Sequence, residues 1–221
     1  MLQADSVSYT EGLPEEPNSP PPPPVAPPTE DSWFNGDYFQ TFTGKHFYLM
    51  NPRVEDVCIE DVAHALARTC RYGGHVSVEN YSVAEHSCLI AQYVLDNWTA
   101  YAPAYRRTLA LRGLLHDAPE AYYGDIKRPI KHEPSIKAVL GPIFAKVDGV
   151  VFAALGVPPD ELLAIKALDR RIVRDEKVQV MNGEPCKPDM AGMPPLNVAI
   201  RGLLPGAAEE WFLRLYRELR Q

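Results

Sequence analysis

Apolar residues recur at three- and four-residue steps over most of the chain beyond residue 53, which is the spacing of one buried face of an α-helix. In the first such stretch the apolar positions are Ile59, Val62, Ala63 and Leu66. The pattern predicts helices over residues 54–70, 82–98, 103–116, 136–155, 159–181 and 207–220. Pro142 is expected to make the fourth of these helices begin late or kink. The sequence therefore predicts an all-α protein.

The two ends of the chain differ in composition from this helical region. Residues 1–32 carry a proline run from Ser19 to Pro28, which favours polyproline II and predicts a disordered tail; a ligand for an SH3-like module is the alternative. Alternation from Gln40 to Tyr48 predicts a short hairpin. We expect one helical domain over residues 33–182, then a Pro/Gly-rich linker and an amphipathic helix over 183–221. That last helix either packs back on the bundle or contacts another subunit.

Two local signals mark helix ends. Ser82 and Glu85 have the spacing of a capping box, in which the serine caps the helix and the glutamate reaches back. This fixes a helix start at Ser82 and places His86 one turn inside, on the apolar face, where it is either core filler or a rigid ligand. Gly73-Gly74 ends the preceding helix, and paired glycines also allow the backbone to approach a ligand closely.

Composition limits the classes of partner. The 221 residues include 22 Lys+Arg and 29 Asp+Glu, a net charge of −7, which excludes a global basic field for nucleic acid. An anionic substrate must therefore be held by a few local cations. Four cysteines without a CxxC pair indicate a reducing compartment, and no apolar run approaches the roughly 20 residues of a membrane helix. We expect a cytoplasmic protein with no membrane contact.

The dipeptide His116-Asp117 follows an apolar helical run, and Pro119 ends that helix. A nitrogen and a carboxylate at a helix joint can serve one divalent metal such as Zn, Co, Mn or Fe. The alternative is a helix cap or a surface feature. Further along, Lys166 and Asp169 lie three residues apart and so share one side of a helix, which is also the spacing of a solvated charge pair.

The order His86, His116-Asp117 and Asp169, each on a separate predicted helix, resembles the H…HD…D pattern of the HD-domain metal-dependent phosphohydrolase superfamily. More closely, the chain is similar to the small deoxynucleotide-hydrolysing branch, which includes YfbR-like 5′-deoxynucleotidases and phage or bacterial deoxynucleoside triphosphate triphosphohydrolases. The matching phrases are Ser82-Val-Ala-Glu-His-Ser87, Leu114-Leu-His-Asp-Ala-Pro-Glu120, Gly124-Asp-Ile-Lys-Arg-Pro129 and Lys166-Ala-Leu-Asp169. The resemblance covers roughly residues 40–182. It implies that residues 33–182 form an HD-domain helical bundle with the site in its core.

The resemblance also implies roles for the acidic and histidine residues. The implied metal ligands are His86, His116, Asp117 and Asp169, holding a divalent ion (Co, Mn, Zn or Mg) with open positions for water and a phosphate oxygen. Glu120 is the implied general base or acid beside that water. Asp125 matches a second acidic position that orients the nucleophile or assists protonation; its alternative role is to cap its own loop.

Substrate contacts are implied in the same way. Arg71, Lys127 and Lys166 are the candidate phosphate-binding cations. Arg71-Tyr72 matches an Arg-Trp pair of the nucleotidase relatives, so Tyr72 is expected to stack on the deoxyribose; the change from Trp to Tyr weakens the case for discrimination against ribonucleotides. Gly73-Gly74-His75 is expected to line the base side, and the small glycines leave adenine and guanine both open.

The predicted function is hydrolysis of a dNTP, with dATP or dGTP favoured, to deoxynucleoside and triphosphate. The first alternative is a 5′-deoxynucleotidase, and the second, from another class, is a nucleotide-sensing HD module without turnover. A further alternative is an HD relative that acts on cyclic dinucleotides or alarmones, although such relatives usually sit in longer multidomain chains or carry other signatures, which this sequence does not show. The expected partners are a small deoxynucleotide and further copies of the chain in a dimer or hexamer, with no stable nucleic-acid complex. The expected setting is the cytoplasm of a bacterium, with a phage-encoded protein as the other origin.

Overall fold

The computed structural model describes residues 37–158, 162–182 and 192–221. The expected Pro-rich tail, with its SH3-ligand alternative, and residues 183–191 of the expected linker lie outside these ranges. Within them the chain is mostly helical, so the all-α prediction is confirmed. The predicted hairpin is present as two short antiparallel strands, β1 (Phe39–Gln40) and β2 (His46–Phe47), with Phe39 opposite Phe47.

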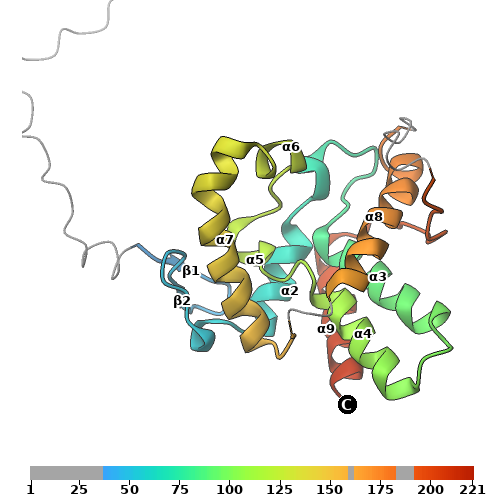
Figure 1. The fold of residues 1–221 in the computed structure, drawn as a ribbon, viewed down its shortest axis with the longest axis horizontal. Helices are drawn as coiled ribbons and strands as arrows, with labels where there is room; N and C mark the ends of the chain where they lie inside the picture. The colour runs from blue at the N-terminus through green and yellow to red at the C-terminus, as the bar shows by residue number, and fades with distance from the viewer. Residues whose placement is uncertain (1–36, 159–161, 183–191) are drawn as a thin grey trace, which may run out of the picture.

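The helical elements follow one another around a common core (Figure 1). In chain order they are η1 (Val54–Asp56), α2 (Ile59–Arg68), η2 (Arg71–Gly74), α3 (Val83–Asn97), α4 (Pro103–Leu115), α5 (Glu120–Tyr123), α6 (Arg128–Lys131), α7 (Pro134–Ala154), α8 (Leu162–Gln179) and α9 (Pro205–Arg220). No described helix combines the length and the apolar character needed to cross a lipid bilayer.

Three helix boundaries differ from the expectation. The helix predicted over residues 54–70 is broken, because Val57 and Cys58 are extended between η1 and α2. The fourth predicted helix starts at Pro134, ahead of Pro142 and not after it, since a proline in the first turn loses no intrahelical bond. The expected loop over residues 124–129 ends early, because Arg128 begins the short helix α6.

Helix α3 lies in the core and provides the rigid frame of the site. Every residue from Val83 to Ala91 is buried, and α3 packs against α2, α4, α8 and α9. The C-terminal helix α9 packs on α2, α3 and α4 with Phe212 fully buried. Of the two roles expected for this helix, the structure therefore shows packing on the bundle. In Figure 1, α7 lies on the side of the hairpin and α8 on the opposite side of the bundle.

Half of the predicted capping box forms at the start of α3. Ser82 Oγ accepts a hydrogen bond from the Glu85 N–H at 3.1 Å, as predicted. The Glu85 carboxylate, however, does not reach back. It accepts hydrogen bonds from the backbone N–H groups of Arg201 (2.7 Å), Gly202 (3.2 Å) and Leu203 (2.8 Å). Glu85 therefore connects α3 to the segment that leads into α9, a partner that local spacing does not reveal.

Candidate metal centre

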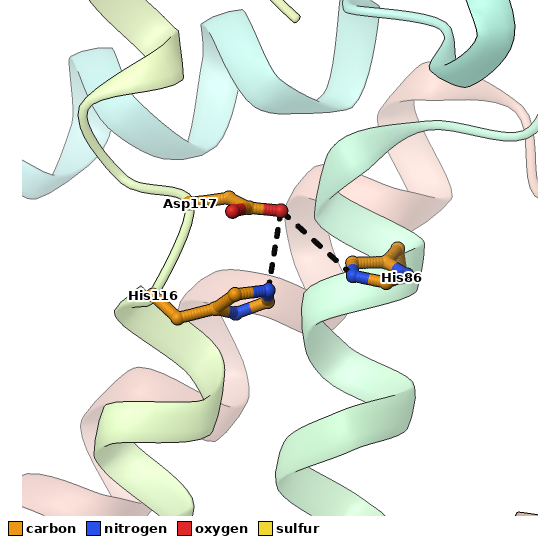
Figure 2. Close-up of side chains that lie close together, drawn as sticks. All are labelled: His86, His116 and Asp117. Atoms are coloured by element: carbon orange, nitrogen blue, oxygen red, sulfur yellow. Dashed lines mark ion pairs between the residues drawn. The ribbon is translucent and has the colours of Figure 1, made fainter. Parts of the chain in front are cut away.

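Three of the predicted ligands form a compact group between α3 and the end of α4 (Figure 2). Each of His86, His116 and Asp117 offers one ligand atom, and these atoms all lie within 4.8 Å of one another. Asp117 Oδ2 is 3.2 Å from His116 Nε2 and 3.8 Å from His86 Nε2. This group of two nitrogens and one carboxylate can hold a divalent metal ion.

Local structure brings the two histidines to this point. His116 continues the helical backbone of α4, and its Nδ1 is 2.8 Å from the carbonyl oxygen of Gly113, which fixes the ring. Gly113 also lets α3 and α4 approach closely, because a Cβ there would lie 3.1 Å from Ile90 Cγ2. As a result the rings of His86 and His116 have centroids only 5.3 Å apart.

The nitrogens that face the centre fit a metal ion. His86 Nδ1 is 2.8 Å from Glu176 Oε1, so Nε2 is the atom left to face Asp117. The Nε2 atoms of His86 and His116 are both buried and make no hydrogen bond with any residue that the structure describes. Buried polar atoms without a partner are rare in folded proteins. Two such atoms beside one carboxylate indicate that this set of donors is suited to a cation.

Asp169, the fourth predicted ligand, reaches the group from α8. Its Oδ1 lies 3.2 Å from His86 Nε2, but its side chain is 39% exposed and it stands outside the compact group of three. Burial alone would raise the pKa of Asp169, but the close contact with His86 and the charge of His86 hold that pKa well below its ordinary value. Asp169 is therefore an ionised carboxylate at the edge of the centre.

Asp117 and His116 lie close enough together that each shifts the pKa of the other. Burial would raise the pKa of Asp117, but His116 lowers it below the ordinary value. Burial would lower the pKa of His116, yet the charge of Asp117 raises it to about 9. Without a metal, the pair thus holds a carboxylate and an imidazolium, and a ligand role for His116 requires the loss of this proton.

Glu120 lies at the first residue of α5, close to the metal-binding group. Burial, followed by the charges of Asp117 and Asp125, raises the pKa of Glu120 to about 8. Its Oε1 is 3.6 Å from Lys131 Nζ, and its Oε2 is buried without a hydrogen bond to the described residues. A carboxyl group with this pKa can exchange a proton near neutral pH. Asp125, half-buried in the loop after α5, acts on Glu120 through its charge.

The predicted phosphate contact Arg71 lies beside the metal-binding group. Its Nη1 is 3.7 Å from Asp117 Oδ2, and its Nε is 3.1 Å from Glu176 Oε1. The next residue, Tyr72, has a φ of 57° and donates its hydroxyl to Glu176 Oε2. A non-glycine residue in the left-handed region is uncommon and is often found at functional sites.

The remaining predicted substrate residues divide into two groups. Lys127 lies over the η2 segment, because a Cβ on Gly73 would come within 2.3 Å of Lys127 Nζ. Gly74 (φ +81°) and His75 are exposed at the end of the same segment. Lys166 is exposed on α8, one turn before Asp169. The structure thus brings Lys127 to the Arg71–Gly74 segment, while Lys166 lies on the Asp169 side.

Glu176 was not among the site residues predicted from the sequence. It is fully buried and lies two helical turns after Asp169 on α8. A signal was available: Ile165, Leu168 and Ile172 mark the buried face of this helix, and the same period reaches residue 176. A carboxylate at a position that the pattern reserves for an apolar side chain needs buried partners.

Two further histidines, His46 and His64, lie away from the centre. His46 is exposed and stacks on Tyr38, with ring centroids 3.8 Å apart. His64 is half-buried, stacks on Phe42 at 3.6 Å, and has its Nδ1 3.2 Å from Glu209 Oε2. Neither ring belongs to the compact group of His86, His116 and Asp117.

Fold and site together define a mainly helical protein with a His-His-Asp group that can hold a metal ion. The uncharacterised protein YfdR of Escherichia coli (strain K12) is 30% identical over 187 residues, which are 83% of this chain and 96% of YfdR. The chain belongs to the same protein family as YfdR. The uncharacterised protein RCAP_rcc00048 of Rhodobacter capsulatus is 32% identical over 170 residues, which are 73% of this chain and 82% of that protein. No family model matches the chain.

Proposed function

We propose that this protein is a metal-dependent phosphohydrolase of the HD-domain superfamily that converts a dNTP, dATP or dGTP by preference, to deoxynucleoside and triphosphate. The observation that carries the proposal is the meeting of two buried, unbonded imidazole nitrogens with the Asp117 carboxylate, beside the Arg71 guanidinium. A metal site alone has many uses. A metal site next to a buried cation that cannot lose its charge suits a phosphate ester.

His86, His116, Asp117 and Asp169 hold the divalent ion. When bound, the ion supplies Lewis-acid polarisation of the phosphate and a lowered pKa for water. Glu120 would be the general base or acid for the nucleophilic water, since its pKa of about 8 lets it both accept and release a proton near neutrality. Arg71 neutralises charge on the phosphate nearest to Asp117.

The remaining cations suit a polyphosphate better than a single phosphate. Lys127 lies over Gly73 and Lys166 lies one turn before Asp169, so phosphate-binding groups flank the centre on two sides. The hydroxyl of Tyr72 is held by Glu176, which fixes the ring at the segment where the deoxyribose binds. Gly74 leaves open space beside it for the base.

A product-resolved assay tests the proposal. The protein is stripped with a chelator, reloaded with Co, Mn, Zn or Mg, and incubated with each dNTP and dNMP, and nucleoside, triphosphate and phosphate are separated by ion exchange. We expect equal amounts of deoxynucleoside and triphosphate from a purine dNTP, and none from the stripped protein. Free phosphate from dNMPs with intact dNTPs would show a 5′-deoxynucleotidase instead. Nucleotide binding without any product would show a sensing module.

The Asp117→Ala variant tests the metal centre itself. We expect it to lose hydrolysis by on the order of 10³-fold or more, because it removes the carboxylate that bridges the two histidines. Asp96→Ala, at an exposed position of α3, is the matched control and should keep full activity. Unchanged turnover in Asp117→Ala contradicts the assignment.

A further inference from the structure

Glu176 is the point where the metal-binding group meets the proposed substrate segment. Its Oε1 lies 2.8 Å from His86 Nδ1, accepts the Tyr81 hydroxyl at 2.8 Å and is 3.1 Å from Arg71 Nε. Its Oε2 accepts the Tyr72 hydroxyl and Arg71 Nη2, the latter at 3.3 Å. Four residues from two other parts of the fold thus converge on one buried carboxylate.

The chemistry of these contacts determines what Glu176 can do. A carboxylate next to His86 Nδ1 selects the tautomer that carries a hydrogen there, and so leaves Nε2 free to bind a metal. The same carboxylate neutralises the largely buried guanidinium of Arg71 and holds the hydroxyl of Tyr72. Tyr72, whose backbone is in the left-handed region, is thus tied to Glu176 through its side-chain hydroxyl. The orientation of the substrate segment and that of a metal ligand therefore depend on one side chain.

We propose that Glu176 is a positioning residue that couples metal binding at His86 to the conformation of the Arg71–Tyr72 segment. A metal ion held at Nε2 would make the Nδ1–H of His86 a stronger donor to Glu176, and Glu176 would then hold Arg71 and Tyr72 more firmly as well. By reciprocity, ordering of Arg71 and Tyr72 strengthens metal binding. The substrate segment is thus ordered in the loaded protein before nucleotide arrives. The coupling rests on the metal centre of the proposed function, but not on hydrolysis.

Metal affinity without nucleotide is the first test. Co²⁺ is titrated into chelator-stripped protein and followed by calorimetry and by its visible absorption. In Glu176→Gln, one acceptor oxygen is replaced by an NH₂ group that faces Arg71 or His86, and we expect 10- to 100-fold weaker binding and a shifted visible spectrum. Glu218→Gln, exposed on α9, is the control and should match the native protein. Native affinity in Glu176→Gln overturns the proposal.

Hydrogen exchange tests the coupling itself. Saturating Co²⁺ should slow exchange in residues 71–75 of the native protein but not of Glu176→Gln, while residues 116–119 remain protected in both. Tyr72→Phe keeps the contact between Glu176 and His86, so its Co²⁺ affinity should fall by only the coupling factor, about threefold or less, while the protection of 71–75 by Co²⁺ is lost. Tyr105→Phe, an exposed residue of α4, is its control. If Co²⁺ still protects residues 71–75 in Glu176→Gln and in Tyr72→Phe, the coupling is overturned.

The outcomes separate the two proposals. Co²⁺ binding with the expected variant effects but no nucleotide hydrolysis overturns the proposed function alone. Hydrolysis by a native protein whose Glu176→Gln and Tyr72→Phe variants behave as the native one overturns the coupling alone. If Glu176→Gln does not fold, as judged by circular dichroism in chelator, Tyr72→Phe still decides, because its half-buried ring is retained.

Discussion

Glu120 shows how the fold sets the charge of a single residue. Burial together with Asp117 and Asp125 raises its pKa to about 8 from an ordinary 4.5. Between these two values the folded protein binds a proton that the unfolded chain has released. The free energy of unfolding contributed by this group is therefore highest at low pH and falls as the pH rises through this window.

Glu120→Gln should remove this pH dependence in the metal-free protein. A neutral amide has no proton to lose, so we expect the variant to be more stable than the native protein by about 2–4 kcal/mol at pH 9. The gain should shrink steadily towards pH 5. Urea unfolding in chelator at several pH values measures it, with Glu210→Gln, exposed on α9, as the control. An equal gain at pH 5 and pH 9 would contradict the raised pKa.

At the scale of elements, α3 is the helix on which the centre depends. It begins inside the core, where its first N–H groups cannot be satisfied by water, and Ser82 Oγ accepts the N–H of Glu85 there. His86 follows one turn later and is held from the side of α8 by Glu176. The position of this candidate metal ligand thus depends on a helix cap and on the packing of a second helix.

Ser82→Ala should lower the free energy of unfolding by about 1–2 kcal/mol, because it leaves a buried N–H without its acceptor. For a chain of this size, this corresponds to a fall in melting temperature of roughly 2–8 °C. Ser135→Ala is the matched control, since the Ser135 hydroxyl lies exposed near the start of α7 and donates to the side chain of Glu133. Equal melting temperatures for the two variants would show that the cap contributes nothing.

At the scale of the whole molecule, Glu85 connects the C-terminal segment to helix α3 in the core. Its carboxylate accepts three successive backbone N–H groups from Arg201 to Leu203, just before α9 begins. Helix α9 then covers α2, α3 and α4 with Phe212 in the core. The residues after 192 are therefore part of the packing that holds α3 in place.

Glu85→Gln should loosen this connection. The amide group has one acceptor oxygen, so at least one of three N–H groups loses its partner, and we expect a loss of about 2–3 kcal/mol in unfolding free energy. Hydrogen exchange should rise at residues 201–203 and change little in α7. Glu218→Gln serves as the control. Unchanged exchange at 201–203 would contradict the role of Glu85.

The sequence by itself determined what depends on near neighbours. Three- and four-residue periodicity predicted most of the helices, and Ser82 marked the start of α3. His116-Asp117 at a helix end and His86 on an inward helix face were recognisable as candidate metal ligands. These features follow from contacts between residues a few positions apart, which the order of residues displays directly.

Only the tertiary structure decided which distant groups meet. Glu85 had the spacing of a capping residue, but its partners lie more than a hundred residues later. Glu176 was one acidic residue on an amphipathic helix until α8 packed on α3 and gave it His86, Tyr81, Tyr72 and Arg71. A buried carboxylate must find donors wherever the packing supplies them, because leaving it unpaired would cost more than the fold can offset. Its partners are thus set by the way the helices pack, which no local pattern records.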